Sequence, residues 1–321
     1  MAVASVVSAS GFGGLENSPL ARIGYHNKII AEGWTKEFLP HITNTSIDNR
    51  VVACNQMVQF TRAPSVGDWK PYEKNQELVP DYISPEAFCL RVCNAAYKSF
   101  KFDKLDISRI CDRWAPFEEA FLKATYERLA ETWRSYVLNA MVLEADPKNK
   151  GKRAGCNKQL NLGAANAPIK ITAENFAREL AKIKRALIDS RRWVENEMFV
   201  MIPSALWEVL VDTPYVNQSI IGGNCAGGDC SLLVTGLIPN KMLGFNVFVV
   251  DCLPQVIDEG TGALSYYIIA GHKEAYGFVG DIIEGEIVRP PRYFGIEYQM
   301  LAVWGGKAIY PDALAVAYWT F

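Results

Sequence analysis

The chain has 321 residues, half of them hydrophobic, so it is long and apolar enough to bury a sizeable core. Its formal net charge of −2 argues against sequence-specific nucleic-acid binding. No apolar run reaches the roughly 18 residues of a membrane span, and the N-terminal stretch MAVASVVSASGFGG lacks the basic start of a signal peptide. We therefore expect a globular protein that is made and kept in the cytoplasm.

Eight cysteines are scattered through apolar or small-residue contexts, with no Cys-x-x-Cys pair. Cys89 and Cys93 stand four apart, and Cys225 and Cys230 flank a glycine-rich stretch, but neither pair is matched by a second pair at zinc-site spacing. The cysteines are therefore expected to be free and buried, with no metal site and no cofactor site.

Residues 1–50 mix small residues with scattered aromatic residues and show only a short helical pattern near Asn27–Leu39. This segment is too polar and irregular to build a core of its own, yet it carries apolar side chains that need something to lie against. We interpret it as an arm.

Two extended stretches follow, Val51–Arg62 and Ala87–Lys104, and the second has aromatic residues at alternate positions. Between them lies a polar stretch with four prolines and no helical period. A connector of this length in a compact domain usually has a function or reaches a partner. We interpret residues 54–103 as a long projecting hairpin; the alternative is an ordinary surface loop on a monomer.

The longest helical pattern is Asp112–Asp146, with apolar residues mostly three or four apart. Pro116 fits only in a first turn, so Asp112 or Arg113 should lie near the N-cap. The polar residues of this helix are interpreted as a solvated face rather than as acid or base catalysts: Glu118, Glu119, Lys123, Glu127, Arg128, Glu131 and Arg134.

Residues 147–170 carry five Lys and one Arg without interleaved aromatic residues, and they are interpreted as a solvated linker. A second helix is predicted from an N-cap at Thr172 through Arg192, followed by a buried strand at 198–202 and a short helix after Pro203. The glycine-rich residues 220–230 lack the order of a phosphate-binding motif and are predicted to form a flexible loop.

The remainder predicts strands over FNVFVV and SYYIIA, a short helix from His272 to about Gly280, and a further strand through Arg289. Tyr293–Trp304 alternates as a strand does, Gly305-Gly306 allows a tight turn, and Leu314–Phe321 forms a last strand inside a sheet. The fold class is therefore α+β.

This order resembles the major capsid proteins of tailed bacteriophages, the Hong Kong 97-type fold. The stretches that carry the resemblance are FVMIPSALWEVL, GLIPNKMLGFNVFVVDCLP, GHKEAYGFVGDI and RPPRYFGIEYQMLAVWGGKAIYPDALAVAYW, and residues 236–321 look like the ending of podovirus-type coat proteins. The resemblance implies an N-terminal arm (1–50), an extended E-loop hairpin (51–105), a peripheral domain with a long spine helix (106–204), an axial domain (205–285) and return strands of the peripheral domain (286–321).

The resemblance also implies a function without catalysis: pentamers and hexamers that form an icosahedral head around double-stranded DNA. The implied partners are further copies of the chain, a separate scaffolding protein, a portal protein, a possible decoration protein, and DNA contacted without sequence specificity; no membrane is involved. The protein would reside in the virion after assembly in the host cytoplasm. The candidate subunit contacts are Trp34, Phe38, Trp69, Lys70, Tyr72, Lys74, Tyr82, Asn224 and Asp229.

Three other functions stay open. An encapsulin-like compartment shares the implied fold. An α/β enzyme would place its site around His272 and Glu274, or near Asp281, Glu284 and Glu286. A carbohydrate-binding module would use the aromatic residues of the last strands, although their alternation more simply indicates a buried sheet face: Tyr293, Phe294, Tyr298, Trp304, Tyr310, Tyr318 and Trp319.

Overall fold

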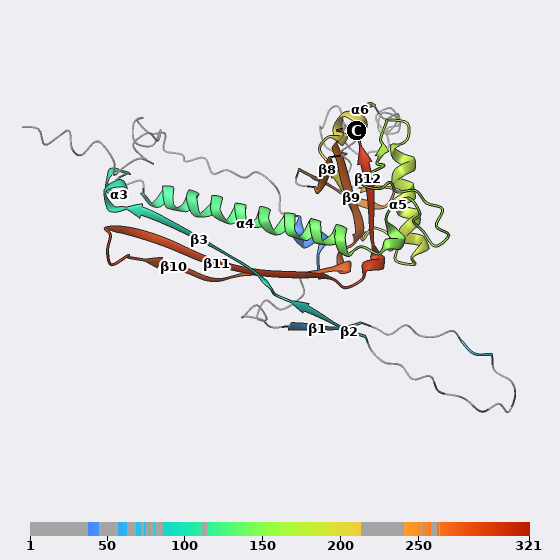
Figure 1. Ribbon diagram of the computed structural model, residues 1–321, viewed down its shortest axis with the longest axis horizontal. Helices are drawn as coiled ribbons and strands as arrows, with labels where there is room; N and C mark the ends of the chain where they lie inside the picture. The colour runs from blue at the N-terminus through green and yellow to red at the C-terminus, as the bar shows by residue number, and fades with distance from the viewer. Residues whose placement is uncertain are drawn as a thin grey trace, which may run out of the picture. The chain divides into compact units, whose positions relative to one another are not determined.

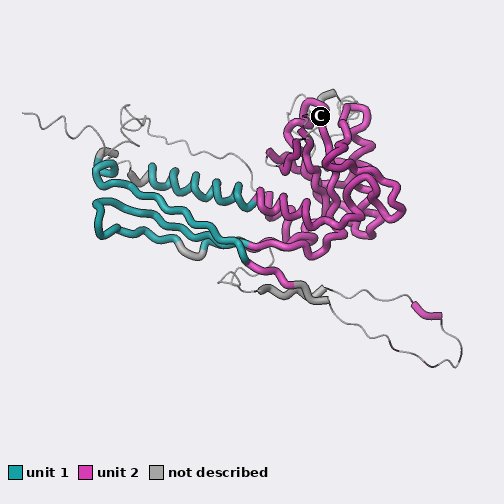
Figure 2. The backbone as a smooth tube through the Cα atoms, in the orientation of Figure 1, with its two compact units in different colours: residues 1–37, 93–133, 280–304 teal, residues 38–92, 134–279, 305–321 magenta. Residues whose placement is uncertain are grey.

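The computed structural model describes residues 38–44, 57–62, 69–71, 74, 77, 80, 86–110, 114–212, 241–251, 253–257, 262 and 264–321. The chain divides into two compact units (Figure 2). Unit 1 takes residues 1–37, 93–133 and 280–304, and unit 2 takes residues 38–92, 134–279 and 305–321.

Unit 2 is built on a mixed seven-stranded sheet with the order β4-β12-β9-β5-β7-β6, in which β8 pairs with β9 (Figure 1). Its strands are β4 Ile169–Lys170, β5 Met198–Pro203, β6 Lys241–Met242, β7 Phe245–Val250, β8 Gln255–Ile257, β9 Leu264–His272 and β12 Leu314–Thr320. Strand β5 is parallel to β7, whereas β9 is antiparallel to both β5 and β12. All six residues of β5 are buried, as expected for a continuous apolar run in the middle of a sheet.

The helices and turns of unit 2 connect these strands. They are α2 Leu39–Ile42, the C-terminal part of α4 Trp114–Glu144, η3 Pro147–Asn149, α5 Phe176–Asp189, α6 Leu206–Asp212, η4 Lys273–Ala275 and η5 Pro311–Ala313. The predicted strands at 198–202, FNVFVV and SYYIIA, the helix after Pro203 and the last strand are confirmed.

Helix α5 packs its apolar stripe against β12, next to the buried Trp319. Phe176, Leu180 and Ile183 are at most 4% exposed, and the Phe176 ring meets the Trp319 ring edge to face at 6.0 Å. The predicted N-cap at Thr172 is wrong. The N-cap is Asn175, whose side chain accepts a bond from the Thr172 N–H and donates to the Lys170 carbonyl.

The predicted end of this helix is also wrong, because α5 ends at Asp189 rather than at Arg192. The Ser190 N–H caps the last turn, and Arg191 then takes a left-handed conformation with φ of 55°. A left-handed residue stops a helix because it turns the chain away from the helix axis.

The end of the predicted arm belongs to the core of unit 2. Leu39 is 5% exposed, Ile42 is fully buried, and the Thr43 hydroxyl donates to the Leu39 carbonyl. The Asn44 N–H donates to the Tyr276 carbonyl at 2.8 Å, which joins this segment to the start of β10 Tyr276–Val288. The apolar side chains of this part of the predicted arm therefore lie against the core of unit 2; residues 1–37 lie outside the described residues.

Residues 147–170 are not a solvated linker, so that prediction is wrong. Asn149 is fully buried, where its amide donates to the Asp312 carbonyl and its carbonyl accepts from the Ser190 hydroxyl. Leu162 is 1% exposed, and the segment ends in β4, which pairs in parallel with β12. Satisfied polar groups and a few apolar anchors hold this loop on the body even though its sequence is mostly polar.

Two predictions near the C-terminus are wrong. The segment predicted as a helix from His272 to Gly280 is the three-residue turn η4 followed by β10. Gly305 and Gly306 do not form a turn but lie inside β11 Gly295–Ala308. At Gly305 an added Cβ would lie 2.5 Å from the Arg91 carbonyl oxygen, so close backbone approach is the reason for this glycine.

Tyr276 is fully buried in unit 2. Burial raises the pKa of its hydroxyl above the usual value, and the neighbouring Tyr136 and Glu144 raise it further. The fold accommodates only the neutral phenol. The resulting stability is therefore fully present below the unfolded-state pKa of 10.0 and is lost as the pH rises above it.

We expect the free energy of unfolding of the natural protein to fall more steeply above pH 10 than that of Tyr276→Phe, which has no hydroxyl to ionise at this position. The difference between the two slopes should be about 1.4 kcal/mol per pH unit. Urea titrations over an alkaline pH series measure the difference. Tyr293→Phe, at an exposed tyrosine of unit 1, is the matched control. Parallel pH profiles for the natural protein and Tyr276→Phe would contradict the assignment.

Unit 1 contains a three-stranded sheet with the order β10-β11-β3, and the N-terminal part of α4 lies along it (Figure 1). Strand β3 Asn94–Asp103 pairs antiparallel with β11, from Asn94 opposite Trp304 to Asp103 opposite Gly295. Helix α3 Lys104–Ile110 follows β3 directly. The predicted long helix is confirmed, with Pro116 in its first turn.

The predicted hairpin is shorter than expected. Strand β1 Met57–Arg62 pairs antiparallel with β2 Glu86–Arg91. The expected second strand, Ala87–Lys104, is in fact two strands, of which only β2 pairs with β1, while β3 joins the sheet of unit 1.

Aromatic side chains hold α4 on β3 within unit 1. Phe121 meets Phe100 edge to face at 4.7 Å and Phe102 at 5.3 Å. The Tyr298 hydroxyl donates to the Glu118 carboxylate at 2.6 Å, so the prediction that Glu118 lies on a solvated face is wrong. Arg134 is likewise buried rather than solvated, since it lies in unit 2 over the ring of Phe38.

Candidate subunit-interaction surfaces

The segment between β1 and β2 carries a tryptophan that its own chain leaves in water. The Trp69 side chain is 100% exposed, and Lys70 and Lys74 beside it are exposed as well. Tryptophan offers more apolar area for burial than most side chains and is enriched at interfaces between proteins. Trp69 is therefore a candidate contact with another molecule.

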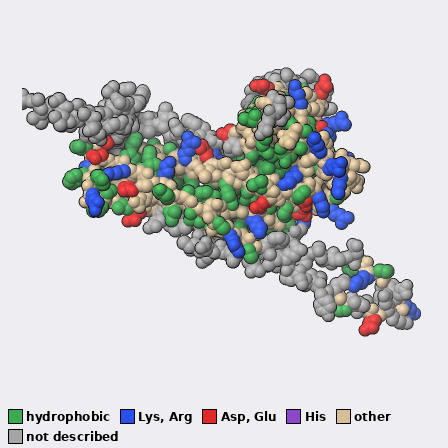
Figure 3. Space-filling model, in the orientation of Figure 1, with side chains coloured by type: hydrophobic (Ala, Val, Ile, Leu, Met, Phe, Trp, Pro, Cys, Tyr) green, Lys and Arg blue, Asp and Glu red, His purple; other side chains and the backbone are tan. Residues whose placement is uncertain are grey.

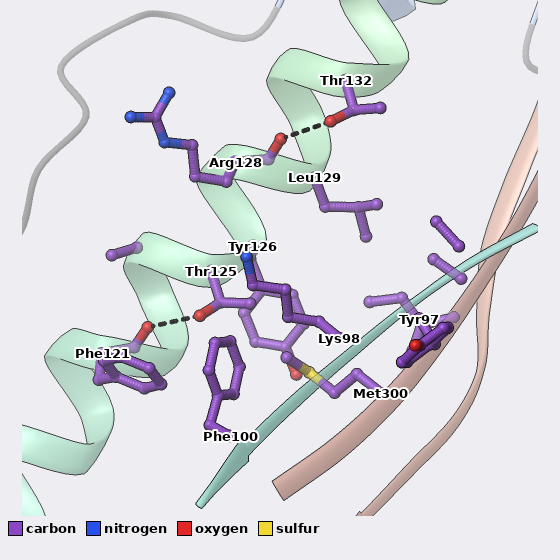
Figure 4. A pocket seen from close by; sticks show the side chains of 14 residues that line it. Tyr97, Lys98, Phe100, Phe121, Thr125, Tyr126, Arg128, Leu129, Thr132 and Met300 are labelled. Carbon is purple, nitrogen blue, oxygen red and sulfur yellow. Dashed lines mark hydrogen bonds between the residues drawn. The ribbon is translucent and has the colours of Figure 1, made fainter.

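Unit 1 has an apolar groove between α4 and its sheet. The groove has a volume of about 320 Å³, and Phe121 and Leu129 reach it from α4 while Phe100 and Met300 reach it from β3 and β11 (Figure 4). Its lining residues are Ala96, Tyr97, Lys98, Phe100, Phe121, Ala124, Thr125, Tyr126, Arg128, Leu129, Thr132, Ile282, Met300 and Ala302.

The threonines of the groove add little polarity to it. The Thr125 hydroxyl donates to the Phe121 carbonyl at 2.9 Å, and the Thr132 hydroxyl donates to the Arg128 carbonyl at 3.0 Å (Figure 4). These bonds within the helix satisfy both hydroxyls, which leaves mainly apolar surface for an occupant. The Tyr97 side chain at the groove is 81% exposed.

A further apolar surface of unit 1 lies where the chain enters β11. Tyr293 is 63% exposed and Phe294 is 88% exposed, and Leu105 of α3 is 56% exposed. The Lys104 N–H donates to the Phe294 carbonyl, which ties these two segments together. The predicted buried face of this strand is therefore wrong at Tyr293 and Phe294, which precede the strand, but confirmed at Tyr298.

Four of the nine predicted contact residues lie among the described residues. Trp69, Lys70 and Lys74 are exposed, whereas Phe38 is 5% exposed and packs within unit 2, so little of its surface is left for a neighbour. The other five lie outside the described residues: Trp34, Tyr72, Tyr82, Asn224 and Asp229. The predicted flexible loop at 220–230 lies outside them as well.

The groove and Phe294 were not predicted as contacts. The apolar residues of α4 and β3 were recognised, but their patterns indicate burial without showing where packing stays incomplete. Phe294 follows a Pro-Pro turn signal, and that position just outside a strand is the signal that favours exposure.

His272, considered above as part of an enzyme site, makes hydrogen bonds that serve the local structure of unit 2. Its Nδ1 accepts a bond from the Glu274 N–H and so caps η4, and its Nε2 lies 2.9 Å from a carboxylate oxygen of Glu197. Asp281 accepts a bond from the Ile282 N–H. In the described ranges, no group of three or more His, Cys, Asp or Glu side chains is arranged to hold a metal ion.

The described cysteines are exposed, so the prediction of buried thiols is wrong for them. Cys89 lies on β2 and Cys93 follows it, while the Cys156 sulfur lies 2.9 Å from the Asp189 carbonyl oxygen in unit 2. In the part of the chain that the structure describes, no helix is long and apolar enough to cross a membrane.

Comparison with solved structures places this fold among those of phage capsids. A chain in a structure of Mycobacterium phage Che8 is 18% identical with a TM-score of 0.65, and the match covers 92% of this chain and 96% of that one. The mature capsid of bacteriophage PhiM1 gives 13% identity and a TM-score of 0.61, covering 92% and 91%. The capsid of Ralstonia phage GP4 gives 10% and 0.61, covering 98% and 97%.

No protein-family model and no curated protein sequence matches the chain. The structural likenesses show that the chain has the α+β fold found in phage capsid structures. The fold implied by the sequence resemblance is therefore confirmed at this level.

Proposed function

We propose that this chain is a major capsid protein of a tailed bacteriophage, with the Hong Kong 97-type fold. Its copies assemble as pentamers and hexamers into an icosahedral head that encloses double-stranded DNA. The observation that carries the proposal is the likeness to phage capsid structures along 92–98% of the chain. A protein of this kind acts through contacts with its own copies, so the proposal includes no catalysis.

The exposed apolar surfaces support this function. In a monomer, a fully exposed tryptophan and an open aromatic groove are unfavourable in free energy, because both leave apolar area in contact with water. In the proposed shell a neighbouring copy buries Trp69, and an apolar segment of a further copy fills the groove of unit 1.

The domain assignment stays as proposed from the sequence, with amendments from the strand pairing. The N-terminal arm loses residues 38–44, of which Phe38, Leu39, Ile42 and Thr43 are buried in unit 2, and the E-loop hairpin ends with β2. Strand β12, assigned to the peripheral domain, pairs with β9 of the proposed axial domain. The further partners are a scaffolding protein, a portal protein, a possible decoration protein and packaged DNA, and assembly takes place in the host cytoplasm to give the virion.

Negative-stain electron microscopy of the purified protein, combined with sedimentation velocity at rising concentration, tests the proposal. We expect rings, hexamer sheets or closed shells that replace the single chain as concentration rises. A protein that remains a single chain at every concentration, or that turns over a substrate in that state, would contradict the proposal and favour the enzyme alternative.

A further inference from the structure

The positive charge of this chain is concentrated in one segment of unit 2. Residues 147–192 contain seven Lys and five Arg against three Asp or Glu, although the whole chain has a net charge of −2. On the face shown in Figure 3, Lys and Arg side chains gather over α5 and the neighbouring loop. The charge asymmetry points to an anionic partner for this surface.

Helix α5 contributes one stripe of this surface. Its apolar face is turned to the sheet, which leaves Arg178, Lys182 and Arg185 at helical spacing on the outer side. Lys182 is paired with Glu179, and Arg185 lies 3.9 Å from Asp189. Arg178 is exposed and forms no ion pair with any residue that the structure describes.

The loop after η3 brings further cations to the end of α5. The Ser190 hydroxyl donates to Asn149, and the Cys156 sulfur contacts the Asp189 carbonyl, so this loop is fixed against the C-terminal end of the helix. The exposed cations that it carries are Lys148, Lys152, Arg153 and Lys158, and none of them forms an ion pair among the described residues. We call these four side chains and those of Arg178, Lys182 and Arg185 the basic surface.

We infer that the basic surface binds the phosphate backbone of double-stranded DNA without reading its sequence; this rests on the proposed function, in which the shell encloses that polymer. Arg178 on the helix and the four cations of the anchored loop form no ion pair among the described residues, so they are available to contact phosphates, whereas Lys182 and Arg185 already have carboxylate partners. Residues 147–170 carry no aromatic side chain, so stacking on single-stranded bases is not part of the recognition. The basic surface would then belong to the face of the subunit that meets packaged DNA.

The test measures binding of the purified protein to a fluorescein-labelled duplex of random sequence by anisotropy over a series of NaCl concentrations. The test variant carries Lys148→Gln, Lys152→Gln, Arg153→Gln and Arg178→Gln. The control variant carries Lys104→Gln, Lys123→Gln, Arg289→Gln and Arg292→Gln, which remove the same charge from exposed positions of unit 1. All eight side chains are exposed, so both variants should fold, as checked by circular dichroism.

We expect the test variant to bind about tenfold or more weakly at low salt and to lower the slope of log K against log [NaCl] by about 2 to 4, since each lost phosphate contact removes about 0.9. The control variant should keep the natural slope. An unchanged slope in the test variant, or an equal loss in both variants, would overturn the inference. So would polyglutamate that competes as well as duplex DNA, because the surface would then suit an acidic protein.

Electron microscopy of the same samples separates this inference from the proposed function. If shells form normally and the test variant keeps the natural salt slope, the inference about the basic surface is contradicted while the proposed function stands. If the test variant lowers the salt slope but the protein never assembles, the proposed function is contradicted while the inference that the basic surface binds DNA is supported.

Discussion

Replacing Trp69 with alanine is expected to raise the protein concentration needed for assembly by about tenfold or more. The indole is fully exposed on its own chain, and in the proposed shell a neighbouring copy buries it. A tryptophan buried at an interface commonly contributes on the order of 2 kcal/mol, and about 1.4 kcal/mol corresponds to a tenfold change in an equilibrium constant. Light scattering over a concentration series measures the assembly threshold.

The free energy of unfolding of the single subunit should stay within about 0.5 kcal/mol of the natural value, as for other exposed substitutions. Leu143→Ala is the matched control, because Leu143 is 77% exposed on α4 and lies outside the candidate surfaces; its threshold should not move. An assembly threshold for Trp69→Ala equal to that of the natural protein would remove Trp69 from the interface.

Replacing Trp319 with alanine is expected to lower the free energy of unfolding by about 3–5 kcal/mol. Trp319 is 1% exposed, lies on β12 between β4 and β9, and packs edge to face on Phe176 of α5. Removing the indole leaves a cavity where the helix meets the sheet. Since domains are commonly stable by about 5–15 kcal/mol, this loss is a large part of the total, and a subunit at the low end of that range would be only marginally folded.

Urea unfolding at neutral pH measures this loss. Tyr293→Ala serves as the control, because its side chain is 63% exposed in unit 1, and it should cost less than about 0.5 kcal/mol. A similar small loss for both variants would mean that the packing of α5 on β12 does not hold unit 2 together.

The elements that the sequence predicted correctly are those whose signals are local and strong. The 3–4 spacing of apolar residues together with Pro116 located α4, and the unbroken apolar run of β5 indicated a strand buried on both faces. Each of these signals lies within the element itself, so no knowledge of distant residues was needed.

The errors arose where distant residues decide the structure. Gly305 predicts a turn when only its neighbours are considered, but the approach of the Arg91 carbonyl from β2 requires a glycine inside a strand. Asn149 suggests a polar linker, yet Asp312 and Ser190, both far away in sequence, satisfy its buried amide. The helix predicted after His272 gave way to β10, whose first residue, Tyr276, is buried against other parts of unit 2.

The candidate surfaces also differ in whether a local sequence signal predicts them. An isolated tryptophan in a proline-rich connector was recognisable as a contact residue, and the structure leaves Trp69 exposed. The groove depends on how closely α4 packs on β3 and β11, which no periodicity records. Of the basic surface, the sequence shows only a lysine-rich stretch. That this stretch lies beside α5 depends on the contact between Cys156 and Asp189, which the sequence does not reveal.

The most direct test of a shell built from this chain is a cryo-electron microscopy reconstruction of its assembled particles. The proposal predicts closed particles with icosahedral symmetry, in which a neighbouring copy covers Trp69 and another copy fills the groove beside Phe121. Particles in which Trp69 folds back onto its own chain and the groove faces solvent, or a preparation that yields only single chains, would contradict it.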